Sequence, residues 1–226
     1  MASHSHSQGG QQAYIVYNSY DKGSIYSRNA VDRLTPDFTA SSLQTGGYIK
    51  DRCIGAEAQA MIKRNGTYFV VSGRGCGFCP HGSSAPVYAS ASPLGPYRPT
   101  GTDINGMTSN ATCNGWGAPA RSWSPPGPYF AIPSQQSFIV QLPDSSSGAE
   151  QWLWGGDHWQ SANVAENGGN RTGHGLGLKS ADAMIWLPMR FTLNSDGAAD
   201  IEPLQRDWHT SWTAELPLPP PLSLGD

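Results

Sequence analysis

The sequence contains few residues whose types and spacing suggest chemistry, and Glu57 is the first of them. It stands between Ala56 and Ala58 in an uncharged run, which suits a carboxyl group that points into a partly desolvated pocket. A carboxylic acid that carries its proton near the working pH can protonate a leaving oxygen. From this local pattern alone, however, an ordinary exposed glutamate at the start of a strand is the better interpretation.

Two adjacent glutamines, Gln135 and Gln136, are the second candidate. Successive residues of a strand point to opposite faces, so only one of the two can line a given site. An amide is barely basic, but it can hold an attacking water molecule by hydrogen bonds, with its carbonyl oxygen accepting one. A polar pair on an edge strand explains the same residues as well, and both interpretations stay open.

The four cysteines are the third candidate. Cys76 and Cys79 form a CxxC pair that His81 follows, but no second CxxC or HxxxH pair completes a tetrahedral zinc site. Cys53 or Cys113 would have to fold in to supply further ligands. A disulfide or free thiols is therefore the better interpretation, and we expect no tightly bound metal.

Composition limits the classes of protein that can hold these residues. The chain has 226 residues with 14% charged residues, 27 Gly, 18 Pro and 23 aromatic residues (8 Trp, 9 Tyr, 6 Phe), which argues against a largely disordered protein. No apolar run is long enough to span a membrane, and a net charge of −3 without a basic cluster argues against nucleic-acid binding. We expect disordered tails at 1–11 and 214–226, and no signal peptide at the start.

Short apolar or alternating runs, each closed by Gly, Pro, Asn or Asp, predict strands between these tails. Asn65-Gly66 is the strongest hairpin signal, because both residues tolerate the positive φ of a type I′ turn. Residues 56–64 consist of good helix formers, but they run directly into this turn, so we predict a strand there. Many short strands predict an all-β sandwich, barrel or propeller. The predicted strands are 13–18, 23–27 (paired with 13–18), 60–64, 67–72, 87–90, 137–142, 151–154 and 183–191.

Several strings occur in the order in which glycoside hydrolase family 43 has them. The most specific is Glu57–Phe69, which resembles the family's "EAPAMFKRNGTYY". The other strings are Ala13–Asn18, Val87–Tyr97, Ser134–Val140, Trp154–Trp159 and Ile185–Met189. The last three of these point to the exo-β-1,3-galactanase branch, and the resemblance covers roughly residues 13–212.

The resemblance implies an all-β, five-bladed β-propeller, of which residues 12–213 form an incomplete domain with about three to four blades. The chain begins inside the equivalent of the second blade, so the catalytic Asp of the family's first blade has no counterpart. Gln59 replaces the family's Pro, Cys76-Gly-Phe78 replaces "TGW", and segments 98–133 and 160–178 are expected to be insertions. Exposed blade edges predict that the chain is marginally stable or self-associates.

The family's functional residues transfer to matching positions. The resemblance implies that Glu57 is the general acid and that Gln135 positions water in place of the base. Phe78, Asp157 and Trp159 are candidate substrate-binding residues. For these three, a structural role in turns and in the blade core is the competing interpretation.

The implied function is inverting hydrolysis of β-linked galactan or a related plant-type polysaccharide. The alternatives are a catalytically incomplete carbohydrate-binding propeller fragment and an incomplete piece without stable function. The expected partner is a polysaccharide or oligosaccharide, with no nucleic acid and no membrane. We expect no cofactor, while a structural calcium ion stays open. The resemblance places the protein outside the cell or in the secretory pathway, where the sequons at Asn65, Asn110 and Asn170 would be glycosylated.

Overall fold

The structure is a computed structural model, and in the part that it describes the protein is all-β, as predicted. The described residues include no helix that is long and apolar enough to cross a membrane. The predicted tails at 1–11 and 214–226 lie outside it. The described residues are 12–20, 26–54, 57–73, 83–105, 132, 134–143, 150–158 and 183–204.

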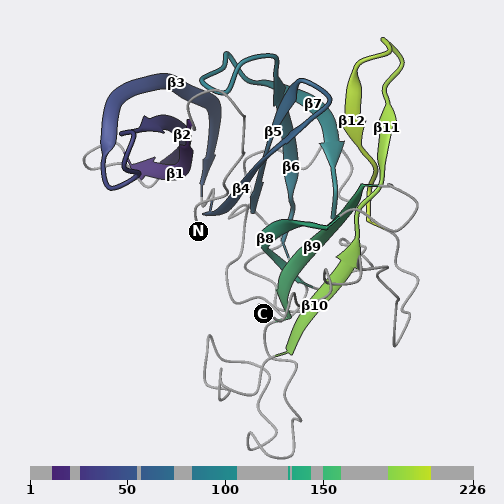
Figure 1. The fold of residues 1–226 in the computed structure, drawn as a ribbon. Coiled ribbons are helices and arrows are strands. Elements are labelled where there is room, and N and C mark those ends of the chain that lie inside the picture. The colour runs from purple at the N-terminus through teal and green to yellow at the C-terminus, as the bar shows by residue number, and fades with distance from the viewer. Residues whose placement is uncertain are drawn as a thin grey trace, which may run out of the picture.

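The strands form antiparallel sheets that follow chain order (Figure 1). Each of the first three sheets starts with one strand, β1, β4 or β8, and adds the next strands on one side of it. The fourth sheet is the β11–β12 pair, and no described sheet closes on itself. The first sheet consists of β1 Tyr14–Tyr20, β2 Tyr26–Leu34 and β3 Ser41–Ile54, and the second of β4 Glu57–Arg64, β5 Thr67–Gly73, β6 Pro86–Ser90 and β7 Arg98–Asp103. The third sheet consists of β8 Gln135–Leu142, β9 Gln151–His158 and β10 Ala183–Pro188, and the fourth of β11 Phe191–Leu193 and β12 Ala199–Ile201.

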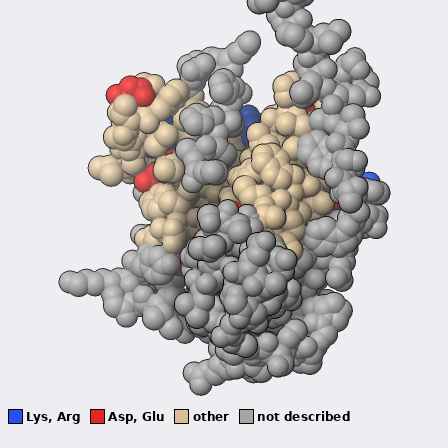
Figure 2. Space-filling view, turned by 90° about the horizontal axis from the view of Figure 1, so that it is seen from below, with Lys and Arg blue, Asp and Glu red and all other residues tan. Residues whose placement is uncertain are grey.

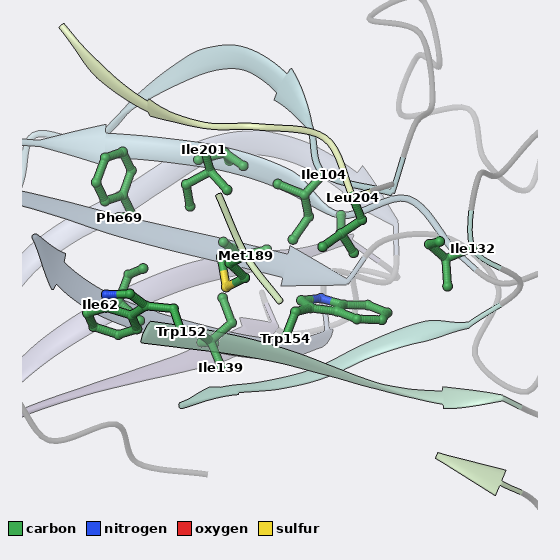
Figure 3. Packing of buried hydrophobic residues seen from close by; sticks show 14 residues of the cluster. Ile62, Phe69, Ile104, Ile132, Ile139, Trp152, Trp154, Met189, Ile201 and Leu204 are labelled. Atoms are coloured by element: carbon green, nitrogen blue, oxygen red, sulfur yellow. The ribbon is translucent and has the colours of Figure 1, made fainter. Parts of the chain in front are cut away.

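The β4–β7 sheet lies between the other two large sheets, because both of its faces are apolar. Alternate residues of a strand face opposite sides, so each strand can supply two cores. One core joins β4–β7 to β8–β9 and β12, and includes Ile62, Phe69, Val71, Trp152, Trp154 and Ile201 (Figure 3). The other joins β4–β7 to β1–β3, and includes Val16, Val31, Ile49, Met61, Val70 and Tyr88.

The β4–β5 hairpin forms where the sequence predicts it. Arg64 pairs with Thr67 across a two-residue turn. Asn65 has a φ of 47° and Gly66 a φ of 79°, so both occupy the left-handed region that a type I′ turn requires. The segment before the turn is a strand rather than a helix, which confirms the prediction for 60–64.

Three sequence predictions were wrong. The predicted strand 183–191 is divided into β10 and β11 by Met189 and Arg190. Met189 still donates its N–H to the Trp152 carbonyl of β9 at 2.9 Å, whereas Phe191 pairs with Ile201 of β12. The predicted insertion 98–133 begins with β7, which pairs with β6 and completes the four-stranded sheet. The predicted strand 13–18 does pair with the strand that follows it, but Tyr14–Asn18 face Asn29–Arg33 of β2 and not the predicted 23–27.

The outer face of the β8–β10 sheet carries exposed apolar side chains. Trp186 is 43% exposed and Met184 is 44% exposed, and the Phe138 ring meets Trp186 edge-on at 4.9 Å between ring centroids. These residues lie on the side away from the core that Trp152 and Trp154 fill. Self-association of the chain stays a prediction, and this face is one that a second copy could cover.

Alkaline pH is expected to destabilise the fold through Tyr97. Burial raises the pKa of Tyr97 above its ordinary value of 10.0, and the neighbouring Tyr68 and Tyr14 raise it further. The folded state therefore holds this proton more tightly than the unfolded state does. The resulting stability is complete below about pH 10 and is lost as the pH rises above it.

Urea denaturation at pH 8 and at pH 11 measures this effect. The midpoint of the wild-type protein should fall at pH 11, and the fall should be smaller in Tyr97→Phe. The variant also loses the hydrogen bond that the Tyr97 hydroxyl donates to the Pro93 carbonyl at 2.9 Å, so it should be less stable at pH 8 by about 1 kcal/mol. An equal fall in both proteins would contradict the assignment.

Candidate functional site

Glu57 and Gln135 meet at the ends of two neighbouring strands. Glu57 is the first residue of β4, and Gln135 is the first residue of β8 in the adjacent sheet. The Gln135 side-chain nitrogen Nε2 donates a hydrogen bond to Glu57 Oε2 at 3.3 Å. Packing of β4 against β8 thus brings together two residues that are 78 positions apart in the sequence.

Asp157 lies at the same end of the β8–β10 sheet. It is the Cα partner of Gln135 in the antiparallel β8–β9 ladder, and its side chain is half-buried. The next strand places Met184 opposite Asp157. Glu57 on β4 and Asp157 on β9 therefore place one carboxylate on either side of Gln135, which is on β8.

The adjacent Gln136 points elsewhere, in agreement with the expectation that only one glutamine lines the site. Gln136 is fully buried, and its Oε1 accepts a hydrogen bond from the indole N–H of Trp154. Within the described part of the chain, its Nε2 has no hydrogen-bond partner. A register shift between Gln136 and Phe138 marks a bulge in β8. Gln135 thus faces the neighbouring sheet's Glu57, while Gln136 belongs to the core.

The close approach of the strands at this point depends on Gly73. It is the Cα partner of Glu57 in β5. A Cβ atom at Gly73 would lie 3.1 Å from the Glu57 carbonyl oxygen and 3.5 Å from Gln136 Cβ. A larger residue would therefore push β4 and β8 apart at the place where Glu57 and Gln135 meet.

The structure does not describe the side chains of the other predicted site residues. Phe78 and Trp159 lie outside the described residues, as do Cys76, Cys79, His81 and Cys113. Cys53 is in β3, but its side chain is not described. Within the described ranges, no group of three or more His, Cys, Asp or Glu residues could hold a metal ion.

Sequence reasoning missed three residues beside Glu57. Gln59, Asn29 and Ser72 form a buried hydrogen-bonded group that joins β4, β5 and β2. The one signal for it in the sequence is Gln59, which stands where the resemblance has Pro. Asn29 and Ser72 carry no local pattern that distinguishes them from other polar strand residues.

Among the described residues on the face that Figure 2 shows, few carry a charge. The described residues there are mostly uncharged, with a few acidic and basic groups that do not form one patch of a single sign.

Neither protein-family models nor curated proteins match this sequence. The similar solved structures include family 43 enzymes. A family 43 β-1,3-galactosidase aligns with a TM-score of 0.50 and 15% identity, over 89% of this chain and 33% of its own. An exo-β-1,3-galactanase from Clostridium thermocellum aligns with a TM-score of 0.48 and 20% identity, over 83% of this chain and 33% of its own. The exo-β-1,3-galactanase from Phanerochaete chrysosporium, solved with galactose, aligns with a TM-score of 0.48 and 20% identity, over 86% of this chain and 33% of its own.

This chain thus spans about a third of the length of these solved chains. At such low identity the likeness concerns the fold alone. The alignment with a TM-score of 0.50 covers 89% of this chain. The chain therefore shares the fold of part of a glycoside hydrolase of family 43.

Proposed function

We propose that the chain is a glycoside hydrolase of the family 43 type, which cleaves β-linked galactan or a related plant-type polysaccharide with inversion. The hydrogen bond between Gln135 Nε2 and Glu57 Oε2 is the observation that carries the proposal. These are the two residues to which the sequence motifs assign the acid and the water-positioning role. The likeness in fold to a family 43 β-1,3-galactosidase supports the same class of reaction.

In this mechanism Glu57 protonates the glycosidic oxygen while Gln135 orients the attacking water. Inverting enzymes keep their two groups about 6.5–9.5 Å apart, so that sugar and water fit between them. The 3.3 Å contact is therefore the arrangement without substrate, and the glycosidic oxygen replaces the Gln135 amide at Glu57. The attacking water cannot give its proton to an amide. We assign this proton to the carboxylate of Asp157, which is the register partner of Gln135 in the β8–β9 ladder.

We further propose that the complete catalytic domain is a five-bladed propeller to which this chain contributes some of the blades. The arrangement of the first strands supports this interpretation. β4 contacts β1 on one side and β8 on the other, and each of these strands begins a sheet whose later strands follow in order. Meandering sheets that radiate from neighbouring first strands are the pattern of propeller blades.

The stereochemistry of the product tests the proposed reaction. Incubation of the full chain with β-1,3-linked galacto-oligosaccharides, followed by ¹H NMR, should first show α-galactose, because single displacement inverts a β linkage. Gln135→Ala should slow its release, whereas Gln141→Ala, an exposed glutamine on the same strand, should not. Release of β-galactose first would contradict inversion.

Binding measured on the same samples separates the second candidate function. The chain spans about a third of the solved chains that it resembles, and the alternative is a catalytically incomplete carbohydrate-binding propeller fragment. Calorimetric titration with the same oligosaccharides should show binding in either case. Binding without any product would exclude the hydrolase and leave the carbohydrate-binding function.

A further inference from the structure

The backbone around Glu57 is irregular in a way that the rest of β4 is not. Glu57 pairs with Gly73 and Ala60 pairs with Val71, so Ala58 and Gln59 together face a single residue of β5. This is a β-bulge, which bends a strand and changes the direction of a side chain. Ala58 within it has a φ of 49°, a left-handed conformation that costs free energy for a residue other than glycine.

Such a conformation persists only where its surroundings fix it, and here a buried asparagine does so. Gln59, the second residue of the bulge, donates its side-chain N–H to Asn29 Oδ1 at 2.8 Å. Ser72, the single residue opposite the bulge, donates its hydroxyl to the same oxygen at 3.3 Å. All three side chains are buried. One acceptor on β2 therefore holds both strands of the bulge.

The bulge lies directly beside the contact between Glu57 and Gln135. A regular strand would have one residue fewer between Glu57 and Ala60, and the Glu57 side chain would turn relative to β8. On the other side, Gly73 lets the two strands approach closely, because a Cβ atom at this position would lie only 3.1 Å from the Glu57 carbonyl oxygen. The direction of Glu57 thus depends on which backbone conformation the bulge adopts.

We propose that Gln59 is a positioning residue, which acts with Asn29 and Ser72 to hold the left-handed bulge at Ala58 and so to direct Glu57 toward Gln135. This inference rests on the proposed function for its catalytic consequence, but the direction of Glu57 can be measured without activity. Gln59 acts through the backbone of its own strand, not on the substrate. It explains why an amide stands at this position, where the motif of the resemblance has Pro.

The Gln135 side-chain amide is a direct reporter of the contact with Glu57. In the full chain labelled with ¹⁵N-glutamine, the Gln135 signal is identified by its loss in Gln135→Ala. Glu57→Gln should shift this signal, because it replaces the carboxylate acceptor. Gln59→Met keeps the length of the side chain but removes its hydrogen-bonding groups. It should shift the Gln135 signal away from its wild-type position, since Glu57 loses its direction.

Two further variants separate positioning from a general loss of stability. Ser72→Ala removes the longer of the two hydrogen bonds to Asn29, and should shift the Gln135 signal in the same direction by a smaller amount; it serves also if Gln59→Met does not fold. Ile62→Val destabilises the buried part of the same strand without touching the bulge, and should leave the signal in place. An unchanged signal in Gln59→Met and Ser72→Ala, or an equal shift in Ile62→Val, would overturn the inference.

Kinetics on galacto-oligosaccharides give the catalytic consequence. Gln59→Met should lower kcat about tenfold to a hundredfold with little change in KM, because misplaced groups mainly affect the transition state. Ile62→Val should leave both parameters near wild type at a temperature where it is folded. A wild-type chain without activity would refute the proposed hydrolase but not the positioning role, which the NMR signals decide independently. A raised KM with unchanged kcat would contradict the catalytic consequence.

Discussion

Replacing Glu57 by Gln is expected to lower hydrolysis of unactivated β-1,3-galactan by about 10²–10⁴-fold, the usual contribution of a general acid. The amide has the size of the carboxyl group and can still form a hydrogen bond with Gln135, but it has no proton to transfer. Aryl galactosides should lose much less activity, because their leaving group departs without protonation. Binding should change little, since the contacts in the ground state survive. Initial rates on both substrates measure the difference.

Glu150→Gln is the matched control for this variant. Glu150 is an exposed glutamate whose Oε2 pairs with Arg64 Nε at 2.7 Å, away from the contact of Glu57 with Gln135. Its replacement removes one carboxylate from the chain without touching the site, and should leave both rates unchanged. If Glu57→Gln reduced the rates on galactan and on aryl galactosides equally, Glu57 would not be the acid.

Local chemistry explains what the sequence could predict of the fold. The β4–β5 hairpin depends on two residues that tolerate positive φ, and these are adjacent in the chain. Strands such as β6, β8 and β9 contain apolar runs whose ends are marked by turn residues. In each of these cases the information that determines the structure lies within a few positions.

Three strands, β3, β7 and the three-residue β12, were missed, and the sequences of the first two lack that information. β3 contains Gly46-Gly47 and an exposed Leu43 with a φ of 59°, so neither alternation nor propensity indicates a strand. Gly46 is needed because the Leu94 carbonyl lies where a side chain would be. β7 is Arg-Pro-Thr-Gly-Thr-Asp, which is typical of a turn, and it becomes a strand by pairing with β6.

The site was predictable only in part for the same reason. Motif resemblance singled out Glu57 and Gln135, but their contact arises from the packing of β4 against β8. The group formed by Asn29, Gln59 and Ser72 comes from three strands of two sheets. The sequence of a strand does not indicate which residue of another strand a polar side chain will contact. Tertiary packing, which no local pattern encodes, therefore determines how the site is assembled.

The same packing makes Trp154 the residue whose loss should destabilise the chain most. Its side chain is fully buried in the core between β4–β7 and β8–β9, near Ile104, Ile132 and Leu204 (Figure 3). Trp154→Ala should lower the free energy of unfolding by about 3–5 kcal/mol, because it leaves a large cavity. It also removes the N–H donor that Gln136 Oε1 accepts from. Urea denaturation followed by circular dichroism measures the loss.

A pair of phenylalanine variants separates the hydrogen bond from the cavity. Trp152 lies two residues away on the same face of β9 and is also buried, but its indole N–H has no hydrogen-bond partner among the described residues. Trp152→Phe and Trp154→Phe remove similar volumes, and only the second removes the hydrogen bond that the Gln136 side chain forms with another described residue. Trp154→Phe should therefore cost about 1–3 kcal/mol more than Trp152→Phe, the usual penalty for a buried polar group that loses its hydrogen bond. Equal losses would mean that the Trp154–Gln136 contact adds nothing to stability, and that burial of the ring accounts for the whole effect.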